Sequence, residues 1–124
     1  MAAIKFTDLI VWQKSYALSV KIQKLIDSFP PEARYRLGDQ MLRAASSIPT
    51  NIAEGFGRWT PKDQAYFYGL AKSSANELKV QLMQSVDFGY CDEARIEAGL
   101  ADEVCAMLYR LRRKVLERGT GGGK

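Results

Sequence analysis

The chain has 124 residues, of which 47% are hydrophobic and 26% charged, and its formal net charge is +4. This length supports one domain with a single core, and the composition is too apolar for an intrinsically disordered protein. The sequence contains no histidine, which excludes the commonest general base and the commonest metal ligand of proteins. We therefore expect no catalytic residues, no metal site and no cofactor.

The first two predicted helices lie between breaks made by proline and glycine. The first extends from about Asp8, whose side chain suits an N-cap, to Phe29, where a pair of prolines ends it. The second begins at residue 38 or 39 and ends at residues 55–57. An interior proline removes one backbone hydrogen bond, so Pro49 predicts a kink of this helix over residues 45–49.

The other two predicted helices fill the second half of the chain. The third opens at Thr60, a hydroxyl N-cap followed by a proline at the first helical position, and it stops at Gly89. The fourth extends from Asp92 to Arg118. Residues 119–124 (GTGGGK) are predicted to form a flexible Gly-rich tail, so the helical domain covers residues 1–118.

Apolar residues recur in these segments at the three- and four-residue spacing of amphipathic helices. No segment shows the sustained alternation that is typical of a strand. Because long helices joined by short turns pack antiparallel, the sequence predicts an all-α, up-and-down four-helix bundle. The predicted core stripes are Val11, Ser15, Leu18, Ile22, Leu25 and Phe29 in the first helix, Phe67, Ala71, Leu78, Leu82 and Val86 in the third, and Leu100, Val104, Leu108, Leu111 and Val115 in the fourth.

The first helix carries a second apolar face beside its core stripe. This face consists of Leu9, Trp12, Tyr16 and Val20. One interpretation is a broad core stripe with amphipathic aromatic residues at its edge. The other is an interface, since tryptophan and tyrosine are enriched where proteins bind one another. We favour the second interpretation and expect self-association through these four residues.

The second helix has a polar face made of side chains that hydrogen-bond readily. A solvated surface would explain it, but a hydrogen-bonded seam against the third helix or another subunit is the sharper hypothesis. Within this seam Glu54 can reach Arg58 at the i, i+4 spacing. The residues of the predicted polar seam are Arg43, Ser47, Asn51, Glu54 and Arg58, with Ser74 and Glu77 of the third helix.

Three stretches form the most distinctive pattern of the chain. They are residues 6–14 (FTDLIVWQK), Phe29-Pro30 and residues 43–58 (RAASSIPTNIAEGFGR), and the third helix adds Phe67, Ala71, Ser74 and Glu77-Leu78. In this pattern the chain resembles the 23S rRNA intervening-sequence proteins, also called four-helix bundle proteins. The resemblance covers residues 6 to about 90, whereas the fourth helix matches only in length and pattern.

The resemblance implies an up-and-down bundle that assembles, in known relatives, into a homopentameric barrel. Some members are encoded inside intervening sequences of ribosomal RNA genes. A related protein, the accessory variability determinant of diversity-generating retroelements, binds nucleic acid and a reverse transcriptase. The resemblance therefore implies a homopentamer that binds RNA or DNA, with a reverse transcriptase or another protein as a further partner.

Charge is segregated along the fourth helix, with acids in its first half and bases near its end. Matching to the helix dipole explains part of this arrangement, but five bases exceed what the dipole needs. Repeated around an oligomer, they would form a basic ring that binds phosphates in a salt-sensitive way. Tyr109 is the only aromatic residue next to these bases, so there is little surface on which nucleotide bases could stack. We therefore expect binding without base-specific readout. The predicted nucleic-acid-binding residues are Arg110, Arg112, Arg113, Lys114 and Arg118.

These patterns predict a non-enzymatic, oligomeric protein that binds RNA or DNA. The alternative is a protein–protein scaffold without a nucleic-acid ligand. No apolar stretch approaches the roughly 20 residues of a membrane span, so we expect no membrane association. The two cysteines lack a secretory leader before them, and we expect a cytoplasmic protein.

Overall fold

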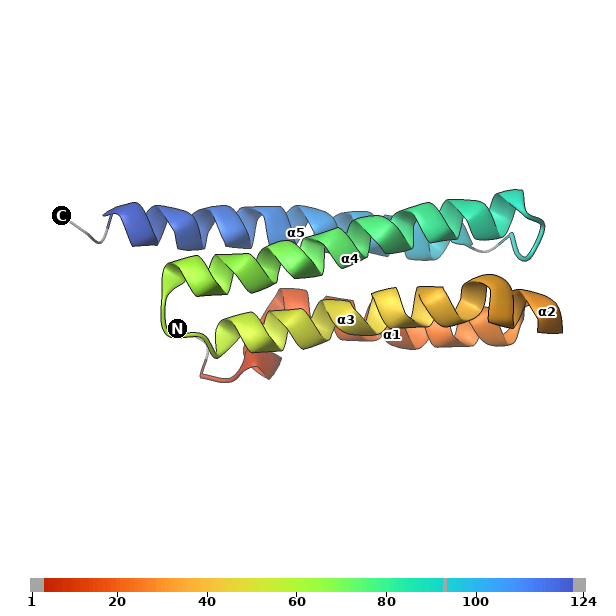
Figure 1. Cartoon of the computed structure of the whole chain (residues 1–124), viewed down its shortest axis with the longest axis horizontal. Helices are drawn as coiled ribbons and strands as arrows, with labels where there is room; N and C mark the ends of the chain where they lie inside the picture. Colours follow the sequence, from red (N-terminus) through yellow and green to blue (C-terminus); the bar gives the residue numbers. More distant parts are fainter. Residues whose placement is uncertain (1–3, 93, 122–124) are drawn as a thin grey trace.

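Four long helices run side by side along the length of the molecule in the computed structural model, which describes residues 4–92 and 94–121 (Figure 1). Within these residues there is no strand, and no helix is both long and apolar enough to cross a membrane. The predicted all-α four-helix bundle is therefore confirmed. The long helices are α1 (Ile10–Asp27), α3 (Asp39–Phe56), α4 (Pro61–Asp87) and α5 (Ala94–Gly121).

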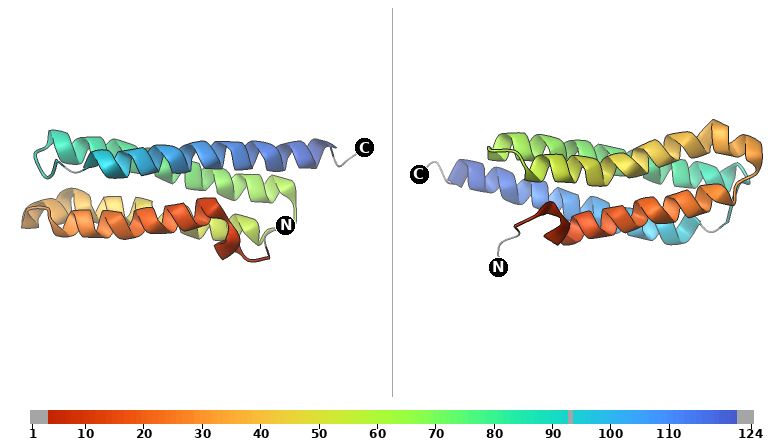
Figure 2. Two further views of the ribbon diagram at one scale, coloured as in Figure 1. Left: turned by 180° about the vertical axis from the view of Figure 1, so that it is seen from behind. Right: turned by 90° about the horizontal axis from the view of Figure 1, so that it is seen from below.

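Each long helix packs against two others. Helix α4 contacts α3 and α5, and α1 contacts the same two helices from the other side. The views in Figure 2 show α1 and α3 as one layer and α4 and α5 as the other. Successive helices reverse direction, which is the up-and-down topology of a bundle with short connections.

The start of α1 differs from the prediction. Its N-cap is Leu9, and Asp8 lies in the preceding short turn η1 (Phe6–Asp8). The Asp8 carboxylate accepts hydrogen bonds from the backbone N–H groups of Ile4 and Lys5, at 3.1 and 3.0 Å. Because the carboxylate is used one turn earlier, it does not cap α1. The helix ends at Asp27, but Phe29 beyond it is still buried.

The chain becomes helical again well before the predicted start of the second helix. Short helix α2 (Pro31–Ala33) leads into η2 (Arg34–Gly38), a π-helical turn that joins α3 directly. A Cβ atom at Gly38 would lie 2.7 Å from Cγ2 of Ile26, so glycine is needed where this turn meets α1. Helix α3 continues through the buried Pro49 as α-helix, and the kink predicted there stays a prediction.

Helix α4 begins as the sequence predicts. The Thr60 hydroxyl accepts a hydrogen bond from the backbone N–H of Asp63 at 3.1 Å, and proline follows the cap. Beyond the end of α4, Gly89 has a φ of +80°, a conformation that glycine adopts without strain. Both signals are local in the sequence, which explains why the two ends of this helix were predicted correctly to within two residues.

Helix α5 starts at Ala94, after the predicted Asp92, and continues to Gly121 rather than ending at Arg118. Its last turns pack on the start of α4, where a Cβ atom at Gly119 would lie 3.1 Å from Cβ of Pro61. The residues beyond Arg118 that extend the helix therefore include one that packs against α4. Of the predicted Gly-rich tail, residues 122–124 lie outside the described residues.

The core runs along the axis between the four helices. All six residues of the predicted α1 stripe are buried, from Val11 to Phe29. In α4, Ala71, Leu78 and Leu82 are buried as predicted, but Phe67 is only half-buried. Val86 is 38% exposed, so its core assignment is wrong. The core face of α4 instead includes Ser85, which lies one residue earlier. The fourth-helix stripe holds for Val104, Leu108 and Val115, with Leu100 and Leu111 partly buried against the core.

Leu78→Ala should destabilise the bundle strongly, because Leu78 is fully buried. We expect the free energy of unfolding to fall by about 2–5 kcal/mol in urea denaturation. Val80→Ala is the matched control on the same helix, since Val80 is 54% exposed. It should change the free energy of unfolding by less than about 0.5 kcal/mol. Equal effects of the two substitutions would contradict the packing described here.

Candidate nucleic-acid interface and aromatic groove

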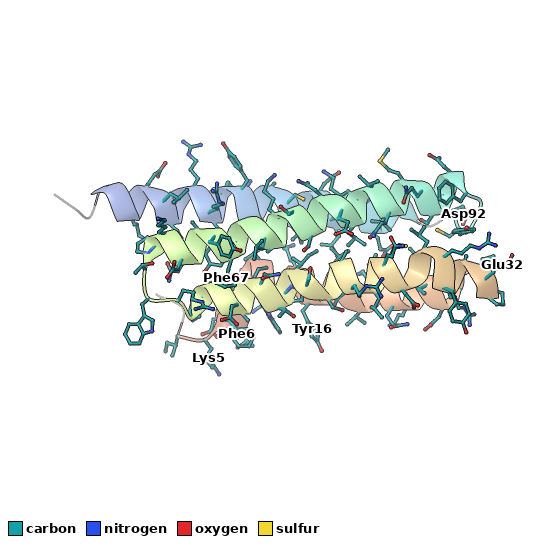
Figure 3. The ribbon with its side chains drawn as sticks, viewed as in Figure 1. Lys5, Phe6, Tyr16, Glu32, Phe67 and Asp92 are labelled. Carbon is teal, nitrogen blue, oxygen red and sulfur yellow. The ribbon has the colours of Figure 1, made fainter. Side chains whose placement is uncertain are left out.

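Three aromatic rings form a stack on the outer side of α1. Trp12 stacks on Tyr16 with ring centroids 5.0 Å apart, and Phe6 meets Trp12 edge-on at 5.2 Å. Tyr16 is 52% exposed and Val20 is 41% exposed, whereas Leu9 and Trp12 are partly buried against the core. The rest of the chain therefore covers the second apolar face of the first helix only in part, and Tyr16 and Val20 remain exposed. Figure 3 shows Phe6 and Tyr16 on the same side of the bundle.

This stack forms one wall of a groove between α1 and α3. The groove has a volume of about 530 Å³. Its other wall is the side of α3 that carries Ser46, Pro49, Thr50 and Ala53, and Glu54 lies at its edge. Sequence reasoning missed Phe6, since nothing in the sequence shows that turn η1 folds back onto Trp12. We call this site the aromatic groove.

Turn η1 depends on Asp8, which holds the segment that carries Phe6. The hydrogen bonds from the backbone N–H groups of Lys5 and Ile4 favour the charged carboxylate, and the positive charge of Lys5 adds to this. The pKa of Asp8 is therefore lowered below its ordinary value. The ionised carboxylate is the form that closes the turn.

The predicted polar seam divides into two groups in the structure. In the first, the Ser47 and Ser74 hydroxyls meet at 2.5 Å between α3 and α4, and Asn51 Nδ2 donates to the Ser47 carbonyl at 2.8 Å. Arg43 and Glu77 line an open cavity of about 410 Å³ with Ser47, next to this contact. These residues form a junction between two helices, as the seam hypothesis requires.

The second group lies one to two turns further along α3. The Arg58 guanidinium donates to the Glu54 carboxylate at 2.6 Å, which is the i, i+4 pair expected from the sequence. The same guanidinium lies 4.5 Å from the ring centroid of Phe67, in a cation–π contact with α4.

The acidic and basic halves of α5 behave differently. Asp102 pairs with Lys79 of α4 at 2.7 Å, and Glu103 pairs with Lys14 of α1 at 2.9 Å. The hydrogen bond from Lys79 to Asp102 raises the pKa of that lysine. These two acids thus connect α5 to α1 and α4. Matching to the helix dipole alone would not require such ion pairs between helices.

The basic residues near the end of α5 lie on different sides of the helix. Arg110, Arg113 and Lys114 are exposed and surround an open cavity of about 420 Å³ with Leu111 and Glu117. The Arg113 Nε donates to Glu117 at 3.2 Å, which raises the pKa of this arginine. We call the surface formed by Arg110, Arg113 and Lys114 the basic face.

The other two predicted bases point elsewhere. Arg118 lies close enough to Tyr68 of α4 for its charge to oppose the rise in the pKa of Tyr68 that burial causes. Arg112 lies over α4, where a Cβ atom at Gly69 would be 3.3 Å from its Nε atom. A glycine inside a helix costs about 1 kcal/mol relative to alanine, so Gly69 is the signal in the sequence for this close approach.

Arg112 belongs to a pocket between α4 and α5 that the sequence did not reveal. The pocket has a volume of about 380 Å³ and is open to solvent. Sequence reasoning missed its α4 residues because they are scattered along a helix with little charge. They are Ala65, Tyr66, Gly69, Leu70, Lys72, Ser73 and Asn76. We call this site the α4–α5 pocket.

Neither cysteine takes part in a disulfide, and burial raises the pKa of the Cys105 thiol. Within residues 4–92 and 94–121, no three histidine, cysteine, aspartate or glutamate side chains are grouped so that they could hold a metal ion. The described sites contain ion pairs, hydrogen bonds and aromatic contacts.

Comparison with known proteins agrees with the pattern found in the sequence. A family model described as 23S rRNA-intervening sequence protein matches residues 7–110. The fold is similar to the crystal structure of a protein of unknown function from the S23 ribosomal protein family of Bacteroides thetaiotaomicron VPI-5482, with a TM-score of 0.75. That match has 21% sequence identity and covers 83% of this chain and 98% of the other. No curated protein matches the chain in sequence.

The Asp8 carboxyl should titrate below the ordinary aspartate range, which carboxyl-carbon NMR can measure. Because its pKa is lowered in the folded chain, its contribution to turn η1 is present above the unfolded pKa and is lost as the pH falls through the folded pKa. We expect the nuclear Overhauser contacts between Phe6 and Trp12 to weaken over that acid range. Asp8→Asn should weaken them at neutral pH, and Asp87→Asn should not. An Asp8 carboxyl that titrates in the ordinary range would contradict this account.

Proposed function

The chain belongs to the 23S rRNA-intervening sequence protein family, and we propose that it is a non-enzymatic protein that binds RNA through the basic face of α5. The link of the family to ribosomal RNA supports RNA over DNA as the ligand. The family alone does not define the binding surface, so the residues must be chosen from the structure.

The observation that carries this proposal is that the acids Asp102 and Glu103 of α5 are paired, whereas two of the three bases of the basic face are not. Both acids are held in ion pairs with neighbouring helices. Within the described residues, Arg110 and Lys114 have no ion-pair partner, although both are exposed. Unpaired cations side by side are suited to phosphate oxygens, and their contacts add up along a strand.

A binding role fits the chemistry of the carboxylates better than catalysis does. Glu54 is engaged by Arg58, and Glu77 accepts a hydrogen bond from Gln81 at 3.5 Å. The sequence has no histidine that could work with either of them.

We further propose that copies of the chain associate through the outer face of α1, as a homopentamer of the kind that the family resemblance implies. Tyr16 and Val20 are exposed there beside the half-buried Trp12. Covering these side chains removes apolar surface from water. Association would also repeat the basic face around the assembly, which strengthens binding to a polyanion.

The aromatic groove supports a second candidate, a scaffold that binds a protein partner without RNA. Its volume of about 530 Å³ and its aromatic wall suit an apolar side chain of such a partner. The two candidates differ in salt dependence. Phosphate binding weakens steeply with salt, whereas apolar contacts in the groove change little.

The first test is RNA binding by the triple variant Arg110→Ala/Arg113→Ala/Lys114→Ala. For the unmodified protein we expect the logarithm of the binding constant to fall linearly with the logarithm of salt concentration. Loss of three phosphate contacts should make that slope shallower by about 2 on single-stranded RNA. Fluorescence anisotropy with a labelled RNA oligonucleotide measures the binding constants of the unmodified protein and of the variant at each salt concentration. A DNA oligonucleotide of the same sequence tests whether RNA is the preferred ligand.

The control is Lys21→Ala/Lys24→Ala/Arg36→Ala, which removes the same charge from exposed positions on α1 and η2. It should leave the slope near that of the unmodified protein. The proposal fails if the unmodified protein does not bind RNA at low salt, or if the basic-face variant keeps its full affinity and slope.

The second test is sedimentation of the unmodified protein and of Tyr16→Asp. The substitution places a charge on an exposed residue, so the bundle should stay folded while the assembly dissociates. Tyr35→Asp, at a residue that is 79% exposed on η2, should sediment like the unmodified protein. A monomeric unmodified protein would end the proposal of self-association.

A further inference from the structure

The α4–α5 pocket presents donors of hydrogen bonds and no acids. Its polar lining consists of Lys72, Ser73 and Asn76 of α4 and Arg112 of α5. No aspartate or glutamate lines it, in contrast to the basic-face cavity, which includes Glu117. Within the described residues no ion pair is formed by Lys72 or Arg112. The pocket therefore carries two positive charges and no acidic side chain in its own lining.

The Arg112 side chain lies close to Gly69 of α4. A Cβ atom at Gly69 would lie 3.3 Å from Nε and 3.7 Å from Cδ of this arginine. The guanidinium stem thus crosses α4 at the one residue where no side chain stands in its way. The planar fork of a guanidinium fits phosphate oxygens.

The orientation of Asn76 adds a donor to the same site. The Cys105 thiol donates to Asn76 Oδ1, with 3.4 Å between sulfur and oxygen. With Oδ1 taken from the α5 side, the Nδ2 group is the part of the amide that can serve a ligand. The Asn76 amide, the Ser73 hydroxyl and the side chains of Lys72 and Arg112 thus provide several hydrogen-bond donors in one pocket. A phosphate group, whose oxygens only accept, is the matching ligand.

An aromatic ring stands at the edge of this set. Tyr66 lines the pocket and is 61% exposed. On the other side, Arg112 also lines a hollow with Tyr109, Arg113, Leu116 and Glu117, and Arg113 belongs to the basic face. The pocket and the basic face are therefore joined through Arg112 and Arg113. A ligand that binds one can extend to the other.

We propose that the α4–α5 pocket binds a phosphodiester of single-stranded RNA between Lys72 and Arg112 and stacks an adjoining base on Tyr66. This inference rests on the proposed function and adds the strand state of the ligand. Tyrosine can stack only on a base that is not enclosed in a duplex, whereas the basic face contacts phosphates of either form. The protein thus prefers single strands because of the pocket and not because of its net charge.

The experiment compares a labelled single-stranded RNA with the duplex of the same sequence, at one salt concentration. Tyr66→Leu should lower the affinity for the single strand about tenfold and leave the duplex affinity within about twofold. Lys72→Gln/Arg112→Gln should weaken single-strand binding more than Lys21→Gln/Lys24→Gln, which removes the same charge from α1. Circular dichroism melting checks that each variant is folded, and Tyr66→Phe, which keeps the ring, should restore binding.

The outcomes separate this inference from the proposed function. If Tyr66→Leu weakens both forms of RNA equally, or neither, while Arg110→Ala/Arg113→Ala/Lys114→Ala still weakens both, the pocket does not bind a single strand and the proposed function stands. If the lysine and arginine pair behaves like its charge-matched control, the phosphate site is overturned. If the unmodified protein binds no RNA, both proposals fail.

Discussion

The close approach of α4 to its neighbours is the constraint on which the other features depend. Helix α4 meets α3 and α5 through small side chains, and a Cβ atom at Gly55 of α3 would lie 2.8 Å from the ring of Tyr68. This closeness brings the Ser47 and Ser74 hydroxyls together and lets Arg112 cross Gly69. A larger residue at Gly55 would press on the ring of Tyr68, and one at Gly69 would displace the Arg112 side chain. The polar seam and the α4–α5 pocket therefore both depend on close packing around α4.

Charge and apolar surface are divided between the two layers of the bundle. The layer of α1 and α3 presents the aromatic groove, and the layer of α4 and α5 presents the basic face and the pocket. Ion pairs from Lys14 to Glu103 and from Lys79 to Asp102 anchor α5 to α1 and α4. One surface therefore remains available for another protein chain while a different surface remains available for a polyanion.

The fold could be predicted from the sequence where the signals are local or periodic, as in the α1 stripe and the cap of α4 at Thr60. The errors arise where tertiary contacts decide, as at Asp8, which closes the preceding turn, and at Val86, which the helical repeat carries out of the core. The candidate site was predicted less well, since neighbours in sequence diverge by about 100° per residue around a helix. Arg112 and Arg113 thus face different sides, and Lys72 joins Arg112 from another helix.

The π-helical turn η2 sets the rotational phase between the end of α1 and the start of α3. A π turn contains one residue more than the α-helix that would span the same rise. Deletion of one residue within Arg34–Gly38 would restore an unbroken α-helix from Pro31 to Phe56 but would rotate the segment before it by about 100°. Ala33, now fully buried, would then turn away from the core while the register of α3 stayed intact. The additional residue is therefore what keeps the connection between α1 and α3 in phase with both helices.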